Sequence, residues 1–508
     1  MTLPTDGVRG FARRQSVLLA CLATLAVHLL SLSRRLGQDE GGYAMVARYW
    51  RDEGAYLYGP QWVDRPPGLI ALFDLAQRLG PYGVRVTAAL TAVLLVAALA
   101  AAAGVVGGRA AAGWAAWAGF ALGSSVLLQT QRLNGELAAA TFVVVSVAAL
   151  LRAVRSPSSR VETVLLGALA GAAAAVAVLM KQNAVDAFVF AAVLLTAGVL
   201  TRANRAICPP AVLRATAVAL VAGASLPVAL TLVWAKSHGG VGDLAYAMYG
   251  FRADASSVIA DWSLDAPLRR LGALALVALG SGLAFLVVHL AVSQRRRLGT
   301  VNPLAWAIAA TAAFELVAML AGGNYWSHYL IALIPMVALA AGLSAHDDAP
   351  GGRWTRGLVV LAATATAVVS PALVLFRADP TTSAYTVGRW VADSADGDDT
   401  IVVLHTHPNV VQASGLRPGY PYSWSLPVRT LDPELSLLLE TLTGPEAPTW
   451  VVRWDPDYYW GLDPESRVDA TLAARYQSVG PVCGYPVWLL DGTERDLAAF
   501  PSASDCTS

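Results

Sequence analysis

Long apolar stretches alternate with short polar connectors over the first three quarters of the chain. Because roughly 20 apolar residues cross the ~30 Å hydrocarbon layer of a membrane, each such stretch predicts a membrane-spanning helix. We expect eleven spans, at residues 15–33, 84–106, 113–129, 136–152, 162–180, 184–201, 211–234, 268–291, 303–321, 328–344 and 356–376. The pattern therefore predicts an all-α polytopic membrane domain.

A shorter apolar segment, 68–80, is not counted among the spans. As a helix rising ~1.5 Å per residue it would reach only about 20 Å, and it contains charged residues. Its apolar positions share one helical face: Leu69, Leu72, Phe73 and Ala76. We expect an amphipathic helix that lies in the membrane interface and does not cross.

Arginines in the connectors predict the orientation of the chain. With the N-terminus in the cytoplasm, every connector predicted to lie inside carries arginine, as the positive-inside rule requires. Counting 68–80 as a span would place these arginines outside. We therefore expect a cytoplasmic N-terminus, an external connector at Gln38–Gly68, and an external C-terminal region.

The pattern changes at about residue 377, which divides the chain into a predicted membrane domain, 1–376, and a C-terminal domain, 377–508. Short strands are predicted at 400–407, 449–454 and 485–490, and helices at 432–443 and 468–476. This predicts a small extracytoplasmic α/β domain. It contains Cys483 and Cys506, for which a disulfide is an open expectation in an oxidising space.

Composition agrees with a membrane protein, since hydrophobic residues make up 56% of the chain and charged residues 14%. The lipid bilayer is thus an expected partner. The formal net charge of +1 gives no reason to expect nucleic acid as a partner. Lys181 and Lys236 are the only lysines among many arginines, and alanine is abundant, which is typical of a high-GC bacterial genome. We expect a multi-pass protein of a bacterial cell membrane.

Carboxylates and the few basic residues gather in the connectors predicted to face outward. The connector Gln38–Gly68 begins with Asp39 and Glu40, and near its end Asp64 and Arg65 precede a double proline. Other outward connectors supply Glu136, Lys181, His328 and Tyr329. This distribution predicts chemistry at the outer membrane face, with ordinary polar connectors as the alternative.

The ordered set of motifs resembles the GT-C membrane glycosyltransferases, in particular the protein O-mannosyltransferases and the lipid A aminoarabinose transferases. The shared features are "DE" after the first span, a basic residue before "PP", a carboxylate connector after the third span, "KQ" after the fifth and "HYLIALIPMVALAAG" in a late span. The resemblance implies an inverting glycosyltransferase. It would move a hexosyl or pentosyl group from a polyprenyl-phosphate carrier to a hydroxyl of a glycan, lipid or protein acceptor.

Such a transfer needs a base for the acceptor proton and positive charge for the leaving phosphate. Asp39 is the candidate base and Glu40 its orienting neighbour, the alternative being that the pair caps a helix. Arg65 stands where the resemblance implies a bidentate phosphate ligand, unless it only snorkels to the interface. Asp64 takes the place of a carboxylate that handles metal or phosphate in the family.

The remaining candidates have weaker arguments. Glu136 matches a family carboxylate, although Asn134 leaves that assignment open. Lys181, and His328 beside Tyr329, are candidate ligands of the carrier phosphate, with a snorkelling lysine and a satisfied interface histidine as the alternatives. All of these residues are predicted to bind substrate.

Two carboxylates, Glu315 inside a span and Asp186 near the start of one, have no role that the resemblance supplies, although an ionisable group in a membrane is usually functional or paired. No tight His, Cys and Asp spacing predicts a metal site, so no cofactor is expected and a divalent metal stays an open alternative. A transporter or lipid-linked-sugar flippase is the main competing function. A receptor or scaffold built on the C-terminal domain is the third.

Overall fold

The computed structural model describes residues 5–53, 56–60, 62–155, 157–201, 209–260, 265–299, 302–454 and 461–507. The chain forms two compact units. The helical unit consists of Met1–Leu32, Pro81–Trp234 and Leu264–Phe376, and the α/β unit of Ser33–Gly80, Ala235–Ser263 and Arg377–Ser508. These two units are defined by contacts within the structure and not by function. The predicted domain boundary at residue 376 therefore stays a prediction.

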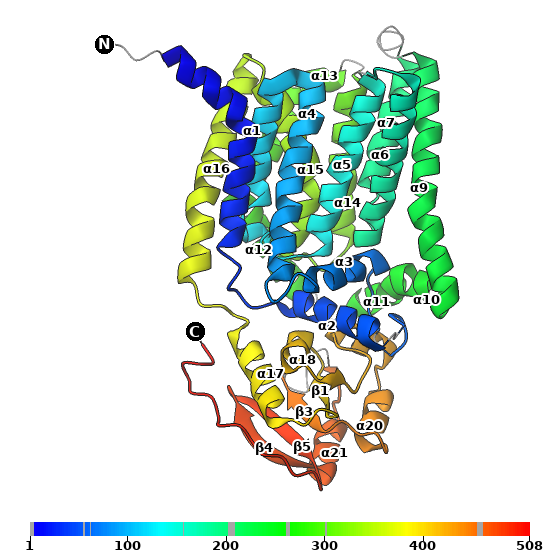
Figure 1. Cartoon of the computed structure of the whole chain (residues 1–508), viewed down its shortest axis with the longest axis vertical. Helices are drawn as coiled ribbons and strands as arrows, with labels where there is room; N and C mark the ends of the chain where they lie inside the picture. Colours follow the sequence, from blue (N-terminus) through cyan, green and yellow to red (C-terminus); the bar gives the residue numbers. More distant parts are fainter. Residues whose placement is uncertain are drawn as a thin grey trace. The chain divides into compact units, whose positions relative to one another are not determined.

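Long helices that run side by side build the helical unit (Figure 1). They are α1 (Thr5–Leu29), α4 (Gly83–Gly123), α5 (Gly135–Arg155), α6 (Arg160–Met180), α7 (Asp186–Leu200), most of α9 (Pro210–His238), α12 (Asp265–Gly280), α13 (Leu283–Gly299), α14 (Pro303–Ala321), α15 (Ile334–Ala345) and α16 (Pro350–Phe376). Two 3-10 segments, η1 (Val126–Leu128) and η3 (Ser327–Leu333), complete the unit.

Helix α4 is a hairpin of two helices. Gly107 and Gly108 have non-helical backbone angles, and Gly108 has a φ of 67°, which glycine adopts without a steric penalty. Beyond this break the chain folds back, because the Cα of Gly119 lies against the side chains of Val96 and Leu99. The predicted spans 84–106 and 113–129 are therefore its two arms, and the second arm ends early, at Gly123.

By length and apolar composition, seven helices among the described residues can cross a membrane, or eight if the bent pair α12 and α13 forms one span. The bend between these two helices is 74°. This count takes α4 as one helix and leaves out the shorter apolar helices Gln15–Leu29 and Asp186–Leu200. The polytopic membrane fold is confirmed, whereas the number eleven stays a prediction.

The amino-terminal part of the α/β unit contains the helices α2 (Gln38–Glu53) and α3 (Pro67–Gln77). With eleven residues, α3 is too short to span a bilayer. Its buried residues, Leu69, Ile70, Phe73 and Ala76, form the apolar face expected for the segment 68–80, with Ile70 fully buried and Leu72 only half-buried.

The predicted polar connector after α9 is helical. It contains α10 (Val241–Ala245), one π-helical turn η2 (Tyr246–Gly250) and α11 (Phe251–Ala260). These short elements belong to the α/β unit together with α2 and α3. A five-residue helix carries too little periodicity to be detected in a sequence, which is why the pattern showed only a connector here.

The C-terminal region forms a five-stranded sheet in the order β2-β1-β3-β5-β4. Strands β2 (Arg417–Pro418), β1 (Thr400–Leu404) and β3 (Trp450–Arg453) are parallel, and β5 (Tyr485–Leu490) joins β3 and β4 (Tyr476–Val482) in antiparallel pairs. The three predicted strands are confirmed. The predicted helix 468–476 corresponds to α21, which ends at Arg475, whereas strand β4 was not predicted.

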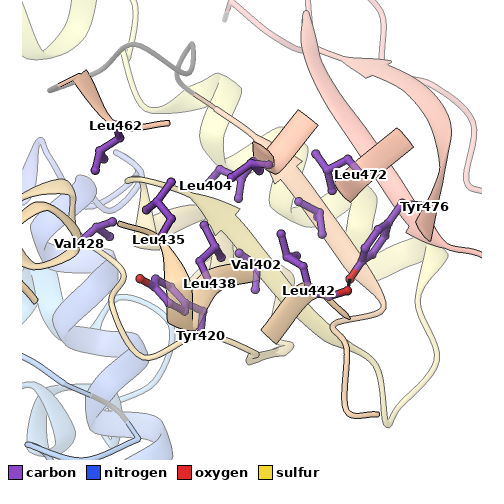
Figure 2. Packing of buried hydrophobic residues seen from close by; sticks show 12 residues of the cluster. Val402, Leu404, Tyr420, Val428, Leu435, Leu438, Leu442, Leu462, Leu472 and Tyr476 are labelled. Carbon is purple, nitrogen blue, oxygen red and sulfur yellow. Dashed lines mark hydrogen bonds between the residues drawn. The ribbon is translucent and has the colours of Figure 1, made fainter. Parts of the chain in front are cut away.

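The described residues of this region also form the helices α17 (Thr382–Ser394), α18 (Pro408–Ser414), α19 (Ser425–Leu431), α20 (Ser436–Thr443) and α21 (Arg467–Arg475). Leu438 and Leu442 of α20 and Leu472 of α21 pack with Val402 and Tyr476 of the sheet in one buried cluster (Figure 2). Each fully buried leucine contributes roughly 1.5–3 kcal/mol. Cys483 and Cys506 form a disulfide.

Candidate active site

The two carboxylates at the start of α2 have different environments. Glu40 is 2% exposed, and its Oε2 accepts a hydrogen bond from the Gly37 backbone N–H at 3.1 Å. This is the contact by which a glutamate in the first turn caps a helix. Asp39 is half-buried, and its Oδ1 accepts a hydrogen bond from Trp424 Nε1 at 3.0 Å. Glu40 therefore accounts for the capping, and Asp39 is left for another role.

Two glycines after this pair allow close packing. A Cβ at Gly41 would lie 2.4 Å from the Asn409 Cβ, and a Cβ at Gly42 would lie 2.3 Å from the Trp424 ring. Either contact is too short for a side chain to remain in place. The "DEGG" sequence therefore brings the first turn of α2 against α18 and against the indole that binds Asp39.

Asp64 binds two arginines. Its Oδ2 lies 2.6 Å from Arg65 NH1 and also forms an ion pair with Arg252 NH2. The Asp64 side chain is 13% exposed, and those of Arg65 and Arg252 are 25% and 36% exposed. Two guanidinium groups therefore lie together on one carboxylate, and both keep part of their surface in contact with solvent. Such a group suits an anion.

Neighbouring tyrosines hold Arg65 in its orientation. Its Nε donates to the Tyr43 hydroxyl at 2.8 Å, and the Tyr58 hydroxyl donates to the Arg65 carbonyl at 3.0 Å. Burial raises the pKa of Tyr58 well above its usual range, so its hydroxyl stays a donor. These contacts fix the side chain and argue against a freely snorkelling arginine.

Arg252 was not among the residues predicted from the sequence. It lies in the first turn of α11, in the connector between α9 and α12. One arginine in a long connector gives no pattern that distinguishes it from a solvated charge. The one usable signal was the predicted external location of this connector, which would place its arginines on the same side as Arg65.

A second cluster lies within the helical unit. Glu136, in the first turn of α5, forms an ion pair with Lys181, the residue that ends α6, and its Oε1 lies 3.5 Å from His328 Nε2. The Lys181 ammonium lies 4.5 Å from the centre of the Tyr329 ring. Glu136 is 8% exposed. This buried carboxylate is thus neutralised by basic groups, as burial of a charge requires.

Glu315 and Asp186, which the sequence left without a role, lie on helices that pack against each other. Glu315 is on α14 and Asp186 in the first turn of α7, and both residues are 5% exposed. Their roles stay open.

The predicted site residues fall into two sets. Asp39, Glu40, Asp64 and Arg65 lie in the α/β unit, and Glu136, Lys181, His328 and Tyr329 lie in the helical unit, where they are in mutual contact. No group of three or more His, Cys, Asp or Glu side chains suited to a metal ion occurs in the described part of the chain. The roles of these residues stay proposals.

Comparison of the whole fold shows similarity to membrane glycosyltransferases. ArnT from Cupriavidus metallidurans matches in the apo state with a TM-score of 0.63 and bound to undecaprenyl phosphate with a TM-score of 0.62. Both alignments have 15% sequence identity and cover 93% of this chain and 97% of ArnT.

The oligosaccharyltransferase AglB from Archaeoglobus fulgidus, in complex with an inhibitory peptide and a dolichol-phosphate, matches with a TM-score of 0.56 at 13% identity. That alignment covers 95% of this chain and 75% of AglB. No protein-family model matches the sequence, and no curated protein matches it either. The structural matches establish that this chain has the GT-C fold, the fold that the sequence motifs resembled.

Proposed function

We propose that this protein is an inverting glycosyltransferase that moves a sugar from a polyprenyl-phosphate carrier to an acceptor hydroxyl. The observation that carries the proposal is the difference between two groups of the α/β unit. In the described contacts Asp39 accepts a hydrogen bond from the neutral indole of Trp424, while Arg65 and Arg252 lie together at Asp64 with part of each side chain exposed. A reactive carboxylate and a cationic anion ligand are the two groups that such a transfer needs.

Each residue has one role in the proposed reaction. Asp39 accepts the proton of the acceptor hydroxyl as its oxygen forms a bond to the anomeric carbon of the sugar. The bond from that carbon to the phosphate oxygen breaks, and the phosphate leaves with the electron pair, so the anomeric configuration inverts. Arg65 and Arg252 stabilise the charge on the leaving phosphate. Glu40 holds the turn that carries Asp39.

The fold supports a lipid-linked donor. ArnT is bound to undecaprenyl phosphate in one matching structure and AglB to a dolichol-phosphate in another. We propose the same kind of carrier here, and a glycan, lipid or protein as acceptor. Lys181, His328, Tyr329 and Glu136 are proposed as further substrate-binding residues, because they concentrate basic and aromatic groups at one place in the helical unit.

Reconstitution of the purified protein into liposomes tests the function. Undecaprenyl-phosphate-linked hexoses and pentoses, radiolabelled in the sugar, would be supplied with glycan, lipid and peptide acceptors. We expect label to move to one acceptor class and free undecaprenyl phosphate to form. Movement of the intact lipid-linked sugar across the bilayer, with no bond broken, would instead identify a flippase.

We also propose that the chain lies in a bacterial cell membrane with a cytoplasmic N-terminus and an extracytoplasmic α/β unit. The Cys483–Cys506 disulfide supports an oxidising location for the C-terminal region. Ala110 follows the break inside α4, in a connector predicted to be cytoplasmic. A cysteine introduced by Ala110→Cys should resist an impermeant thiol reagent in intact cells, and rapid labelling would contradict this topology.

A further inference from the structure

The loop after β1 has features of a binding site that the proposed chemistry does not use. Strands β1 and β3 are parallel neighbours in the sheet. His405, His407 and Asn409 follow β1, and Trp454 follows β3, so all four lie at the carboxyl ends of adjacent parallel strands. In open α/β sheets this edge is where ligands bind.

Two histidines of this loop have unusual backbone conformations. His405 has a φ of 69° and His407 a φ of 63°, in the left-handed region that favours glycine. Each such residue costs on the order of 1–3 kcal/mol and persists where the surrounding structure imposes it, which occurs often at ligand sites. The conformation positions both imidazole rings at the end of β1.

Several buried polar atoms of this loop are unsatisfied. Within the described part of the chain, no hydrogen bond reaches either ring nitrogen of His405, Nδ1 of His407 or Oδ1 of Asn409. His405 is 3% and Asn409 4% exposed. A buried polar atom without a partner is destabilising, so a ligand that supplies hydroxyl groups to these atoms would gain their hydrogen bonds.

The loop offers these groups without net charge. Burial lowers the pKa of His405 and of His407 to about 4, so both rings are neutral at pH 7. Each neutral ring has one N–H donor and one acceptor nitrogen. Arg453, whose charge acts on His405, forms an ion pair with Asp469 at 2.8 Å. The chemistry of the loop therefore suits a neutral ligand and does not suit a phosphate.

Aromatic rings flank these polar atoms. The Trp454 ring stacks on His407 at 4.5 Å between ring centres and on Tyr485 at 3.6 Å, with only 10° between the latter planes. All three side chains are half-buried. Sugars combine C–H faces that pack on aromatic rings with hydroxyls that both donate and accept hydrogen bonds.

We propose that His405, His407, Asn409, Trp454 and Tyr485 form a subsite for a neutral glycan and hold the acceptor of the transfer. The assignment of this glycan as the acceptor rests on the proposed function. The binding of a glycan to the subsite does not depend on it. The loop also contacts the turn that carries Asp39. Gln38 Nε2 donates to Thr406 Oγ1 at 2.6 Å, and Gly41 packs against Asn409.

Binding to the purified full-length protein tests the proposal without any transfer reaction. Short neutral oligosaccharides of mannose, galactose, glucose and arabinose would be titrated by calorimetry into the wild type and three variants. Trp454→Ala removes the stacking ring. His407→Asn removes the imidazole but keeps a residue that tolerates a positive φ. Phe500→Ala, at an exposed ring that stacks on Trp390, is the control in the same unit.

We expect at least one oligosaccharide to bind the wild type and the Phe500→Ala variant equally, and Trp454→Ala and His407→Asn to weaken it roughly tenfold or more. Equal affinity in all four proteins, binding of none of the sugars, or binding only of peptides that contain Ser or Thr would each overturn the glycan subsite. Titration of undecaprenyl phosphate should give unchanged affinity in the variants. The transfer assay tests the proposed function separately. Sugar binding without transfer would contradict the proposed function but not the glycan subsite.

Discussion

The clusters around Asp39 and Asp64 in the α/β unit and around Glu136 in the helical unit contain similar residues but differ in charge compensation. Glu136 is paired with Lys181 and approached by His328, so its charge is neutralised by its neighbours. In the α/β unit, the described contact of the Asp39 carboxylate is the neutral Trp424 indole, and Arg65 and Arg252 share one carboxylate.

This difference separates groups that stabilise a fold from groups that are ready to react. A carboxylate paired with a lysine has its negative charge stabilised and is a weak base for a substrate proton. The described partner of Asp39 is a neutral indole and not a cation, and two guanidinium groups on one carboxylate bring several N–H donors together for a phosphate. We therefore assign the base and the phosphate ligands to the α/β unit.

We expect the largest effect when the ion pair between Lys181 and Glu136 is broken. Lys181→Met leaves Glu136 buried without its strongest partner, and removing one member of a buried pair costs about 3 kcal/mol or more. The unfolding temperature in detergent should fall clearly. The double variant Lys181→Met with Glu136→Gln removes both charges and should recover most of that loss. Equal instability of single and double variants would contradict the compensation argument.

The double variant also separates two roles of Lys181. If this lysine only neutralises Glu136, the double variant should retain transfer activity. If it also binds the substrate, as we propose, the double variant should be stable but show weaker binding of the lipid-linked donor. Calorimetric titration with undecaprenyl phosphate distinguishes the two.

The next effect tests Asp39. Asparagine keeps the size of the side chain and can still accept from Trp424, but it cannot take a proton. Asp39→Asn should therefore fold normally and bind the donor, yet lose on the order of a hundredfold or more in rate. Glu40→Gln is the matched control, since its amide oxygen can still accept from Gly37. Near wild-type turnover by Asp39→Asn would remove Asp39 from the mechanism.

Both clusters could be anticipated from the sequence in part, for physical reasons. Spans and connector charges are long-range patterns, so the polytopic fold and the residues Asp39, Arg65 and Glu136 could be selected. Contacts between distant segments leave no local pattern. Arg252 forms an ion pair with Asp64 far away in the sequence, and Trp424 donates a hydrogen bond to Asp39, and both contacts needed the folded structure.

We expect a smaller effect from substitution of Arg65 or Arg252, the two arginines that bind Asp64. Lysine keeps the charge but loses the planar fork that binds phosphate in a bidentate manner. Arg65→Lys should lower turnover by roughly tenfold or more, about 1.4 kcal/mol, because Tyr43 accepts from the guanidinium and orients it. Arg252→Lys should have a weaker effect, since its side chain is more exposed. Wild-type kinetics for Arg65→Lys would return this residue to a snorkelling role.

The smallest effect concerns the hydrogen bond from Trp424 that orients Asp39. Trp424→Phe keeps an aromatic ring against Gly42 but removes the indole N–H that donates to Asp39 Oδ1. A hydrogen bond of this kind contributes about 1 kcal/mol net, so we expect a loss of roughly fivefold in rate with little change in donor affinity. Trp424→Ala should cost more and also lower stability, because it leaves a cavity beside Gly42 and Tyr43. If Trp424→Phe instead abolished transfer as completely as Asp39→Asn, the indole would be an obligatory part of the site. The contrast between Asp39 as a base and Glu136 as a carboxylate neutralised by Lys181 would then no longer hold.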